Sequence, residues 1–254
     1  EWARVRDYRI GQLAEKSNAQ LYTQSPITAG DVLSFGIPNV VLATGANWRT
    51  DGVGRTHKHP LSYLLSPNVF SPDTLMQTGP DRLPNGTIAI FDDDTFYLGS
   101  VLAEQVAHTG RRVLFITPNP IVAPYSDNTL EQDRIQRRLI DVGVKIISLH
   151  KLAGLFKDTI TAACIYSNVE TVYECQALIP VTMRLPNDRL WLELQARKSD
   201  WQDAGINSVT RIGDCHTPDL IAAAVQAGYQ YGAEFGEPIT TPKREVFAGG
   251  TVQS

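Results

Sequence analysis

The segment Asn39-Val-Val-Leu-Ala-Thr-Gly45 is a continuous apolar run that ends in glycine. A run without alternating polar residues is typical of a strand buried on both faces, and such strands occur in parallel sheets. Two similar runs, Thr87–Phe91 and Arg112–Thr117, enclose a helical pattern over residues 95–109 that Gly110 closes. This order predicts a strand–helix–strand unit. The sequence therefore predicts an α/β protein, doubly wound around parallel sheets.

The remaining elements follow from the same kinds of pattern. Helices are predicted at Trp2–Lys16 (amphipathic), Thr28–Phe35 (with Thr28 as N-cap), Leu130–Val142, Leu190–Arg197 and Pro218–Phe235. Strands are predicted at Ala19–Thr23, Lys145–Leu149 and Ser208–Ile212, and a small antiparallel layer that returns to the sheet at 160–166, 171–174 and 177–182. Residues 46–86 predict a long connection with one helical turn at Ser71–Met76, and a surface tail is expected from Gly236 onward.

Composition excludes several classes of protein. The 254 residues are 43% apolar and 20% charged, with a net charge of −4, which predicts a folded chain without a basic surface for nucleic acid. No apolar run reaches the roughly 20 residues that span a bilayer, and the first residues lack the apolar middle of a signal peptide, so a cytoplasmic protein is expected. The chain begins at Glu1 rather than Met, which suggests a processed or incomplete polypeptide. Three cysteines, none in a Cys-x-x-Cys pair, predict buried free thiols.

Two glycine-containing turns are candidate ligand sites. The first, Ala43-Thr44-Gly45, follows a predicted strand and brings a hydroxyl and an open backbone to the carboxyl edge of the sheet, where open α/β sheets bind ligands. The second, Gly213-Asp214, can offer a carboxylate to sugar hydroxyls, and a helix starting at Thr217-Pro218 would suit a phosphate. The alternatives are a core strand with a glycine turn and an aspartate that only caps a helix or turn.

Longer stretches of the sequence, in this order, resemble the C-terminal third of trimethylamine dehydrogenase and its relatives, which include dimethylamine and histamine dehydrogenases and the demethylases of dimethylglycine and N-methylproline. The stretches are Glu1-Trp2, Arg6–Arg9, Val40–Arg49, Asp51-Gly52, Asp93–Tyr97, Leu102–Glu104, Asn128–Glu131, Arg137–Leu139, Ile212–Asp214 and Pro242–Glu245. The run Arg184–Asp188 is more similar to the demethylases.

The resemblance implies a flavin-dependent oxidoreductase that oxidises amines or N-methyl groups. In that family an N-terminal barrel carries FMN and a four-iron four-sulfur (4Fe-4S) cluster, and electrons pass to an electron-transfer flavoprotein or another acceptor. The resemblance further implies two Rossmann-like domains of the FAD/NAD(P)-binding type: an incomplete, discontinuous one at 1–85 and 183–254, and an inserted one at 86–182. ADP or FAD, shared with a missing segment, would contact Ala43, Thr44, Gly45, Gly213 and Asp214, with Thr217 at the phosphate. The complete enzyme would be a homo-oligomer whose barrel is this chain's partner.

The first departure from this family's pattern is the missing pyrophosphate-binding turn. Nothing in residues 1–39 supplies a Gly-x-Gly-x-x-Gly motif, and Gly52-Val-Gly54 does not open a helix. A sheet without that unit lacks its central strand. We therefore expect part of its edge to be paired with a missing segment or exposed.

The second departure is the run Asp92-Asp93-Asp94, which stands where a nicotinamide-binding fold needs glycines. Carboxylates at this turn would repel a pyrophosphate and block its approach to the backbone, and Asp93 or Asp94 is expected to cap the following helix. This predicts a domain that has lost NAD(P)H binding. A metal site at the three aspartates, or at His57 and His59, is a weaker alternative.

No catalytic or metal-binding residue is assigned to this chain, because none of the common catalytic motifs occurs in it. Two other functions stay open. One is a non-catalytic docking module for an electron-transfer partner, without bound nucleotide. The other is a working NAD(P)H reductase domain, which the three aspartates disfavour.

Overall fold

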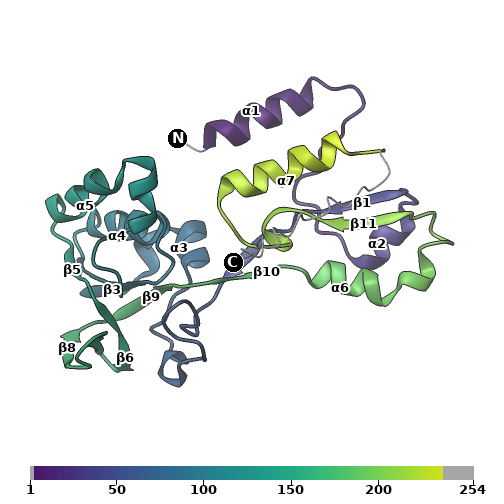
Figure 1. Cartoon of the computed structure of the whole chain (residues 1–254). Coiled ribbons are helices and arrows are strands. Elements are labelled where there is room, and N and C mark those ends of the chain that lie inside the picture. The colour runs from purple at the N-terminus through teal and green to yellow at the C-terminus, as the bar shows by residue number, and fades with distance from the viewer. Residues whose placement is uncertain (1–2, 237–254) are drawn as a thin grey trace, which may run out of the picture. The chain divides into compact units, whose positions relative to one another are not determined.

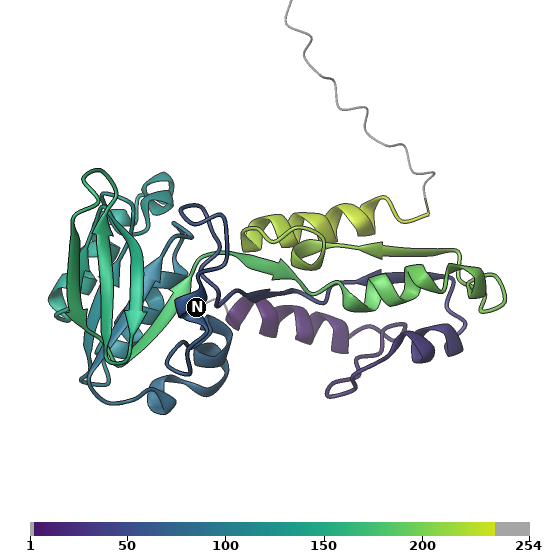
Figure 2. The ribbon, with the colours of Figure 1, turned by 90° about the horizontal axis from the view of Figure 1, so that it is seen from below.

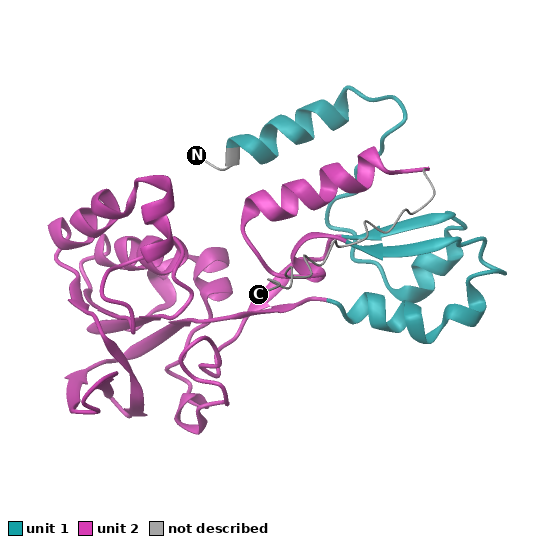
Figure 3. Cartoon of the chain, viewed as in Figure 1, with its two compact units in different colours: residues 1–42, 188–211 teal, residues 43–187, 212–254 magenta. Residues whose placement is uncertain are grey.

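The structure is a computed structural model and describes residues 3–236. Glu1, Trp2 and residues 237–254, which include the run Pro242–Glu245 and nearly all of the expected tail, lie outside the described residues. The chain forms two compact units, each made of two segments (Figure 3). Unit 1 comprises Glu1–Leu42 and Asp188–Arg211, and unit 2 comprises Ala43–Asn187 and Ile212–Ser254.

Unit 1 is built around two parallel strands, β1 (Asn39–Leu42) and β11 (Ser208–Arg211). Its helices are α1 (Ala3–Ala14), α2 (Ala29–Ser34) and α6 (Arg189–Ala196), followed by a 3-10 turn at Lys198–Asp200. Among the described residues no other strand pairs with β1 or β11, and most positions of both strands are only half-buried. This agrees with the expectation of an incomplete sheet whose edge is left without a partner.

Of three sequence predictions for unit 1, the Thr28 cap and the first helix are confirmed and one strand is wrong. Thr28 caps α2 as predicted, since its hydroxyl accepts the N–H of Asp31 while the Asp31 carboxylate accepts the N–H of Thr28. The strand predicted at Ala19–Thr23 is wrong, because these residues form no strand and Leu21 and Tyr22 are exposed. The helix predicted at Trp2–Lys16 is confirmed as α1, but its apolar side chains are largely exposed.

Unit 2 contains a four-stranded parallel sheet in the order β5-β4-β3-β9 (Figure 1). Its strands are β3 (Thr87–Asp92), β4 (Arg112–Ile116), β5 (Lys145–Ile147) and β9 (Ala177–Val181). Helices α4 (Leu98–Ala107) and α5 (Gln132–Asp141) connect β3 to β4 and β4 to β5. The predicted α/β class and this strand–helix alternation are confirmed.

A second layer in unit 2 is the antiparallel sheet β6-β7-β8, formed by His150–Phe156, Thr159–Cys164 and Glu170–Glu174. In Figures 1 and 2 it lies across the parallel sheet from α4 and α5. Alternate residues of β3 enter two cores: Ile88 and Ile90 pack with Leu102 of α4, whereas Ala89 and Phe91 pack with the cluster that includes Ile160 of β7. Every residue of β3 is therefore buried, as its apolar run predicts.

Unit 2 also contains a short strand pair, two further helices and four 3-10 turns among the described residues. They are the antiparallel pair β2 (Ala46–Trp48) and β10 (Arg184–Pro186), helix α3 (Pro72–Thr78), capped by Ser71, helix α7 (Ile221–Ala233), and 3-10 turns at Ser62–Leu64, Pro80–Arg82, Pro124–Thr129 and Gly213–Cys215. The predicted start of the last helix at Thr217-Pro218 is wrong, because α7 begins at Ile221, after a cap position at Leu220 that makes no side-chain cap bond.

Candidate functional site

Two short loops follow the paired strands β1 and β11. The strands are parallel, and Leu42 lies opposite Arg211 at their last paired positions. The loops Ala43–Gly45 and Ile212–Asp214 therefore leave the same edge of this sheet. Gly45 has φ +74° and Gly213 has φ +61°, a backbone conformation that favours glycine. A methyl group on Gly45 would meet no atom within 4 Å, so this loop leaves its backbone open to a ligand.

The first loop is held by Asn187. The Thr44 hydroxyl donates to the Asn187 carbonyl oxygen at 2.5 Å, and the Asn187 N–H donates to the Gly45 carbonyl at 2.9 Å. The side chains of Ala43 and Thr44 remain exposed. The Thr44 hydroxyl thus has a protein partner for its proton, while its oxygen is still free to accept a bond.

The second loop is held by Arg184, a residue to which sequence reasoning gave no part in the site. The guanidinium donates to the Asp214 carboxylate at 2.6 Å and to the Asp219 carbonyl at 2.9 Å, and it lies over the Trp48 ring at 5.3 Å. The other Asp214 carboxylate oxygen accepts the Asp219 N–H at 3.2 Å. Asp214 is therefore the centre of a folded turn.

Thr217 lies inside this turn. Its N–H donates to the Gly213 carbonyl at 3.0 Å, and its side chain is exposed. The prediction that Thr217 caps the last helix is wrong, because the bonds of Asp214 and Arg184 to Asp219 hold the chain in a turn until the helix begins at Ile221.

The three aspartates at the end of β3, Asp92 within the strand and Asp93 and Asp94 after it, have three different surroundings. Asp92 is fully buried against Gly99 of α4, where a methyl group on Gly99 would stand 2.8 Å from the Asp92 carboxyl carbon. Burial, followed by the nearby charge of Asp94, raises the pKa of Asp92 to about 8. At neutral pH this carboxyl is mainly protonated.

Asp93 anchors a neighbouring loop. Its buried carboxylate accepts the Thr56 N–H and the Thr56 hydroxyl, both at 2.7 Å. The prediction that Asp93 or Asp94 caps the following helix is wrong, since the cap position of α4 is Tyr97 and makes no side-chain cap bond. The Asp93 carboxylate accepts its hydrogen bonds from Thr56, which is distant in sequence, instead of from the N–H groups at the start of α4.

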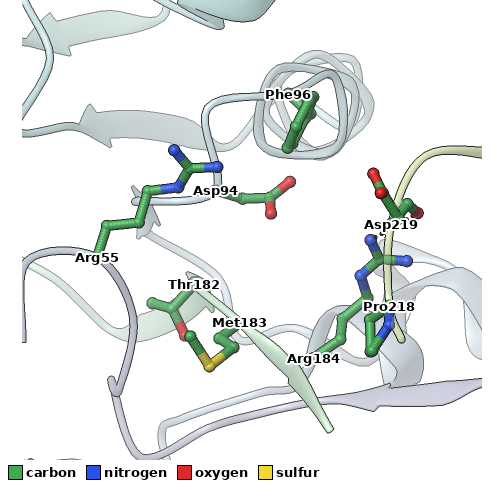
Figure 4. Close-up of a pocket in the computed structure, with 8 residues that line it drawn as sticks. All are labelled: Arg55, Asp94, Phe96, Thr182, Met183, Arg184, Pro218 and Asp219. Carbon is green, nitrogen blue, oxygen red and sulfur yellow. Dashed lines mark hydrogen bonds between the residues drawn. The ribbon is translucent and has the colours of Figure 1, made fainter. Parts of the chain in front are cut away.

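Asp94 faces a pocket of about 420 Å³ within unit 2 (Figure 4). The polar residues that line it are Arg55, Asp94, Thr182, Arg184 and Asp219, and its apolar walls are Phe96, Met183 and Pro218. Burial raises the pKa of Asp94 to about 6, although the positive charges of Arg184 and Arg55 oppose this shift. Among residues 3–236 no cluster of three His, Cys, Asp or Glu side chains could hold a metal ion.

The other sequence-predicted groups are two histidines and three cysteines, of which Cys215 lies in the 3-10 turn Gly213–Cys215. His57 is half-buried with a pKa lowered by burial, whereas His59 is exposed. Cys175 and Cys215 are buried and form no disulfide among the described residues, as predicted, whereas Cys164 is only half-buried, so the prediction of burial is wrong there. Within the described residues no helix is both long and apolar enough to cross a membrane.

Comparison with known proteins reveals extensive similarity to flavin-dependent amine-oxidising enzymes. Dimethylamine dehydrogenase from Hyphomicrobium sp. (strain x) is 32% identical over 92% of this chain and 35% of its own length. The structure of histamine dehydrogenase from Rhizobium sp. 4-9 is 38% identical, with a TM-score of 0.90 over 95% of this chain and 37% of that one. A 6-hydroxypseudooxynicotine amine oxidase from Pseudomonas geniculata N1 is 32% identical, with a TM-score of 0.86 over 92% of this chain and 34% of that one. The chain thus spans about a third of the length of these relatives.

More distant structures share the fold alone. They include a 2-naphthoyl-CoA reductase, with a TM-score of 0.74 at 17% identity, and a flavoprotein disulfide reductase from Escherichia coli, with a TM-score of 0.51 at 16% identity. No family model matches the chain. These likenesses confirm the predicted Rossmann-like, FAD/NAD(P)-binding type of fold.

Proposed function

The chain is a homologue of members of the trimethylamine dehydrogenase family over their C-terminal part, and from this premise we propose that it is the adenine-nucleotide-binding (ADP or FAD) part of a flavin-dependent oxidoreductase that oxidises amines or N-methyl groups. In the whole enzyme the chemistry takes place on a separate barrel that carries FMN and a 4Fe-4S cluster. An electron-transfer flavoprotein or a similar acceptor takes the electrons, and the complete enzyme is a homo-oligomer. This chain contributes no catalytic residue.

The observation that carries the proposal is the alignment of two glycine turns at the ends of two neighbouring parallel strands. Gly45 and Gly213 both have positive φ, and the segments that contain them directly follow the paired residues Leu42 and Arg211. Ligands of open α/β sheets bind at this edge. The proposed contacts to the nucleotide come from Ala43, Thr44, Gly45, Gly213, Asp214 and Thr217.

We assign the other half of the cleft to a segment beyond this sequence. Support comes from the lack of a further strand paired with β1 or β11 among the described residues and from the relatives, of whose length this chain covers 35% and 37%. A central strand with a Gly-x-Gly-x-x-Gly turn would pair with this edge and cradle the pyrophosphate. On this proposal, residues 1–85 and 183–254 belong to the nucleotide domain, and residues 86–182 are the inserted domain that has lost NAD(P)H binding.

A docking module without nucleotide is the alternative that one observation favours. Asp214 and Thr44 already have protein partners in Arg184 and Asn187, so neither needs a nucleotide to satisfy its hydrogen bonding. The two functions differ in a measurable way, because only the first requires ADP or FAD to bind at these loops.

Calorimetry with ADP, AMP and FAD tests the proposal. We expect saturable binding of ADP or FAD to the chain, and a loss of at least about tenfold in affinity in Asp214→Asn. Asp200→Asn is the matched control: the Asp200 carboxylate also pairs with an arginine, Arg197, at 3.0 Å, but in unit 1 and well separated in sequence from both loops. Binding unchanged in Asp214→Asn, or weakened equally in both variants, would reject the site, and no binding at all would favour the docking module.

Two further measurements separate the chain's role from catalysis. NADH should give no saturable binding, because carboxylates occupy the turn after β3. Flavin absorbance and amine-dependent dye reduction should both be absent for the isolated chain. Robust turnover by this chain alone would show that the assignment of catalysis to the barrel is incorrect.

A further inference from the structure

The pocket of unit 2 lies at the topological switch point of the parallel sheet. From β3 the chain passes through α4 to β4 on one side, whereas β9 pairs with β3 on the other side. Asp94 and Phe96 follow β3, and Thr182 and Met183 follow β9. Open parallel sheets bind ligands at this point, outside the carboxyl ends of the strands. The pocket is therefore placed where this fold binds small molecules, yet the proposed nucleotide loops follow other strands.

Two charged groups of the pocket, Arg55 and Asp94, form no salt bridge with any described residue. No carboxylate among the described residues lies within salt-bridge distance of Arg55, whose guanidinium lies 5.9 Å from the centre of the Phe96 ring. The Asp94 carboxylate accepts no hydrogen bond from any described residue, although it is half-buried. Arg184, in contrast, is satisfied by Asp214 and the Asp219 carbonyl. An exposed guanidinium and a half-buried carboxylate, close enough for the charge of Arg55 to act on Asp94 but without a salt bridge, thus face one cavity.

The rest of the lining adds a polar group and an apolar wall. The Thr182 hydroxyl is buried and has no hydrogen-bond partner in the described part of the chain. A buried hydroxyl without a partner costs free energy, which a bound ligand would recover. Phe96, Met183 and Pro218 supply apolar surface next to these groups (Figure 4). A volume of about 420 Å³ is within the range of small-molecule sites.

We propose that this pocket binds a small zwitterion, an amino acid or a related amino carboxylate, whose carboxylate pairs with Arg55, whose ammonium pairs with Asp94, and whose apolar part contacts Phe96 and Met183. A simple anion would meet repulsion from Asp94, and a simple amine would meet repulsion from Arg55. A dinucleotide is disfavoured because its phosphates would lie against Asp94. Thr182 can donate to the ligand carboxylate or accept from its ammonium.

Three probes of nearly equal shape test the charge requirement on the full chain. L-Phenylalanine carries both charges, 3-phenylpropionate lacks the ammonium, and 2-phenylethylamine lacks the carboxylate. We expect calorimetry to show saturable binding of L-phenylalanine, at least about tenfold tighter than that of either single-charge probe. A smaller set, L-leucine with 4-methylpentanoate and 3-methylbutylamine, repeats the comparison without an aromatic ring. Absence of binding by both amino acids, or equal binding of all three members of a set, overturns the proposal.

Charge-removing variants assign the two partners. Arg55→Gln should weaken L-phenylalanine but strengthen 2-phenylethylamine, and Asp94→Asn should weaken L-phenylalanine but strengthen 3-phenylpropionate, because each removes one repulsion. A damaged fold would weaken every probe, so these opposite signs separate recognition from misfolding. Arg112→Gln and Asp133→Asn, at exposed positions that do not line the pocket, should change none of the affinities. Uniform weakening, or no change, in the two pocket variants contradicts the assignment.

The pH dependence gives an independent readout. Asp94 is faced by Arg55 and Arg184, which favour its charged form, and by Asp93, which disfavours it. Its pKa of about 6 means that the carboxylate is lost as the pH falls through this value. Affinity for L-phenylalanine should therefore fall between pH 7 and pH 5 in the wild-type chain and stay level in Asp94→Asn. Affinity that rises on acidification would identify an anion site instead and overturn the proposal.

Discussion

The chain presents two parallel-sheet edges whose strands end in different residues. At the ends of β1 and β11 the loops contain Gly45 and Gly213, both with positive φ, and Ala43 and Thr44 before Gly45 are exposed. At the end of β3 stand Asp92 and Asp93, both at most 1% exposed, followed by the half-buried Asp94. The strands pair in parallel in both places. The residues that follow the strands decide whether the edge offers its backbone to a ligand or closes on its own side chains.

At the carboxyl end of β3, which we call the acidic edge, two of the three aspartates make contacts within the fold. Asp92 packs against α4, and Asp93 binds Thr56 of a distant loop. Only Asp94 is left to face a cavity. At the ends of β1 and β11, which we call the glycine edge, Thr44 and Asp214 bond to Asn187 and Arg184, but no atom lies within 4 Å of the position of a Gly45 side chain. Substitutions should accordingly disturb folding at the acidic edge and ligand binding at the glycine edge.

The largest effect is expected for Asp92→Asn, as a change in how stability depends on pH. Because the folded pKa of Asp92, about 8, exceeds its unfolded value, the folded state holds more protons between about pH 4 and pH 8. Stability contributed by this group is present at low pH and is lost as the pH rises towards 8, by up to roughly 1.4 kcal/mol for each pH unit. Asparagine cannot ionise, so the variant should lack this loss.

Urea unfolding at several pH values measures how the free energy of unfolding changes with pH in the wild-type chain and in Asp92→Asn. Asp94 contributes in the same direction at lower pH, because its pKa is also raised, to about 6. The interval from pH 6.5 to pH 8 therefore reports mainly on Asp92. Parallel pH profiles of wild type and Asp92→Asn in this interval would show that Asp92 is charged in the folded protein, and the contrast between the two edges would lose its electrostatic basis.

The second effect is expected for Gly99→Ala. Alanine favours a helix by up to about 1 kcal/mol over glycine, but its methyl group would stand 2.8 Å from the Asp92 carboxyl carbon. We expect this steric clash to outweigh the helix preference of alanine, so the free energy of unfolding should fall by roughly 1–3 kcal/mol. The double variant Asp92→Ala/Gly99→Ala should be less destabilised than the sum of the single variants. Additive effects in this cycle would mean that Asp92 does not occupy the space beside Gly99.

Much of the fold was predictable because its signals are local and repeated. The apolar runs that became β1, β3 and β4 are continuous, and Gly110 and Gly143 follow the ends of α4 and α5 within three residues, as in a chain that turns back to the sheet. The Thr28 cap was also readable, since both of its partners lie within three residues. Each of these features needs only neighbouring residues to form.

The parts that sequence reasoning missed depend on contacts between distant residues. The pair β2 and β10 joins three-residue strands from positions 46–48 and 184–186, which carry no periodic signal of their own. From the sequence, Asp93 could cap a nearby helix or bind a distant residue, and the structure shows that it binds Thr56. The helix start predicted at Thr217-Pro218 is wrong for the same reason. Arg184 and Asp214 bond to Asp219 and hold the chain in a turn at this point.

The smallest effect on stability is expected for Gly45→Ala. The cost is conformational rather than steric, because φ is +74° and a methyl group would meet no atom within 4 Å. A left-handed alanine costs roughly 1–2 kcal/mol, which places this variant near or below Gly99→Ala in thermal or urea unfolding. The same methyl group would project into the space that the nucleotide backbone is proposed to occupy, so ADP affinity should fall by more than stability does. If Gly45→Ala unfolds more readily than Gly99→Ala while ADP binding is unchanged, this edge is a structural turn, and the difference between the two edges is not one of ligand access.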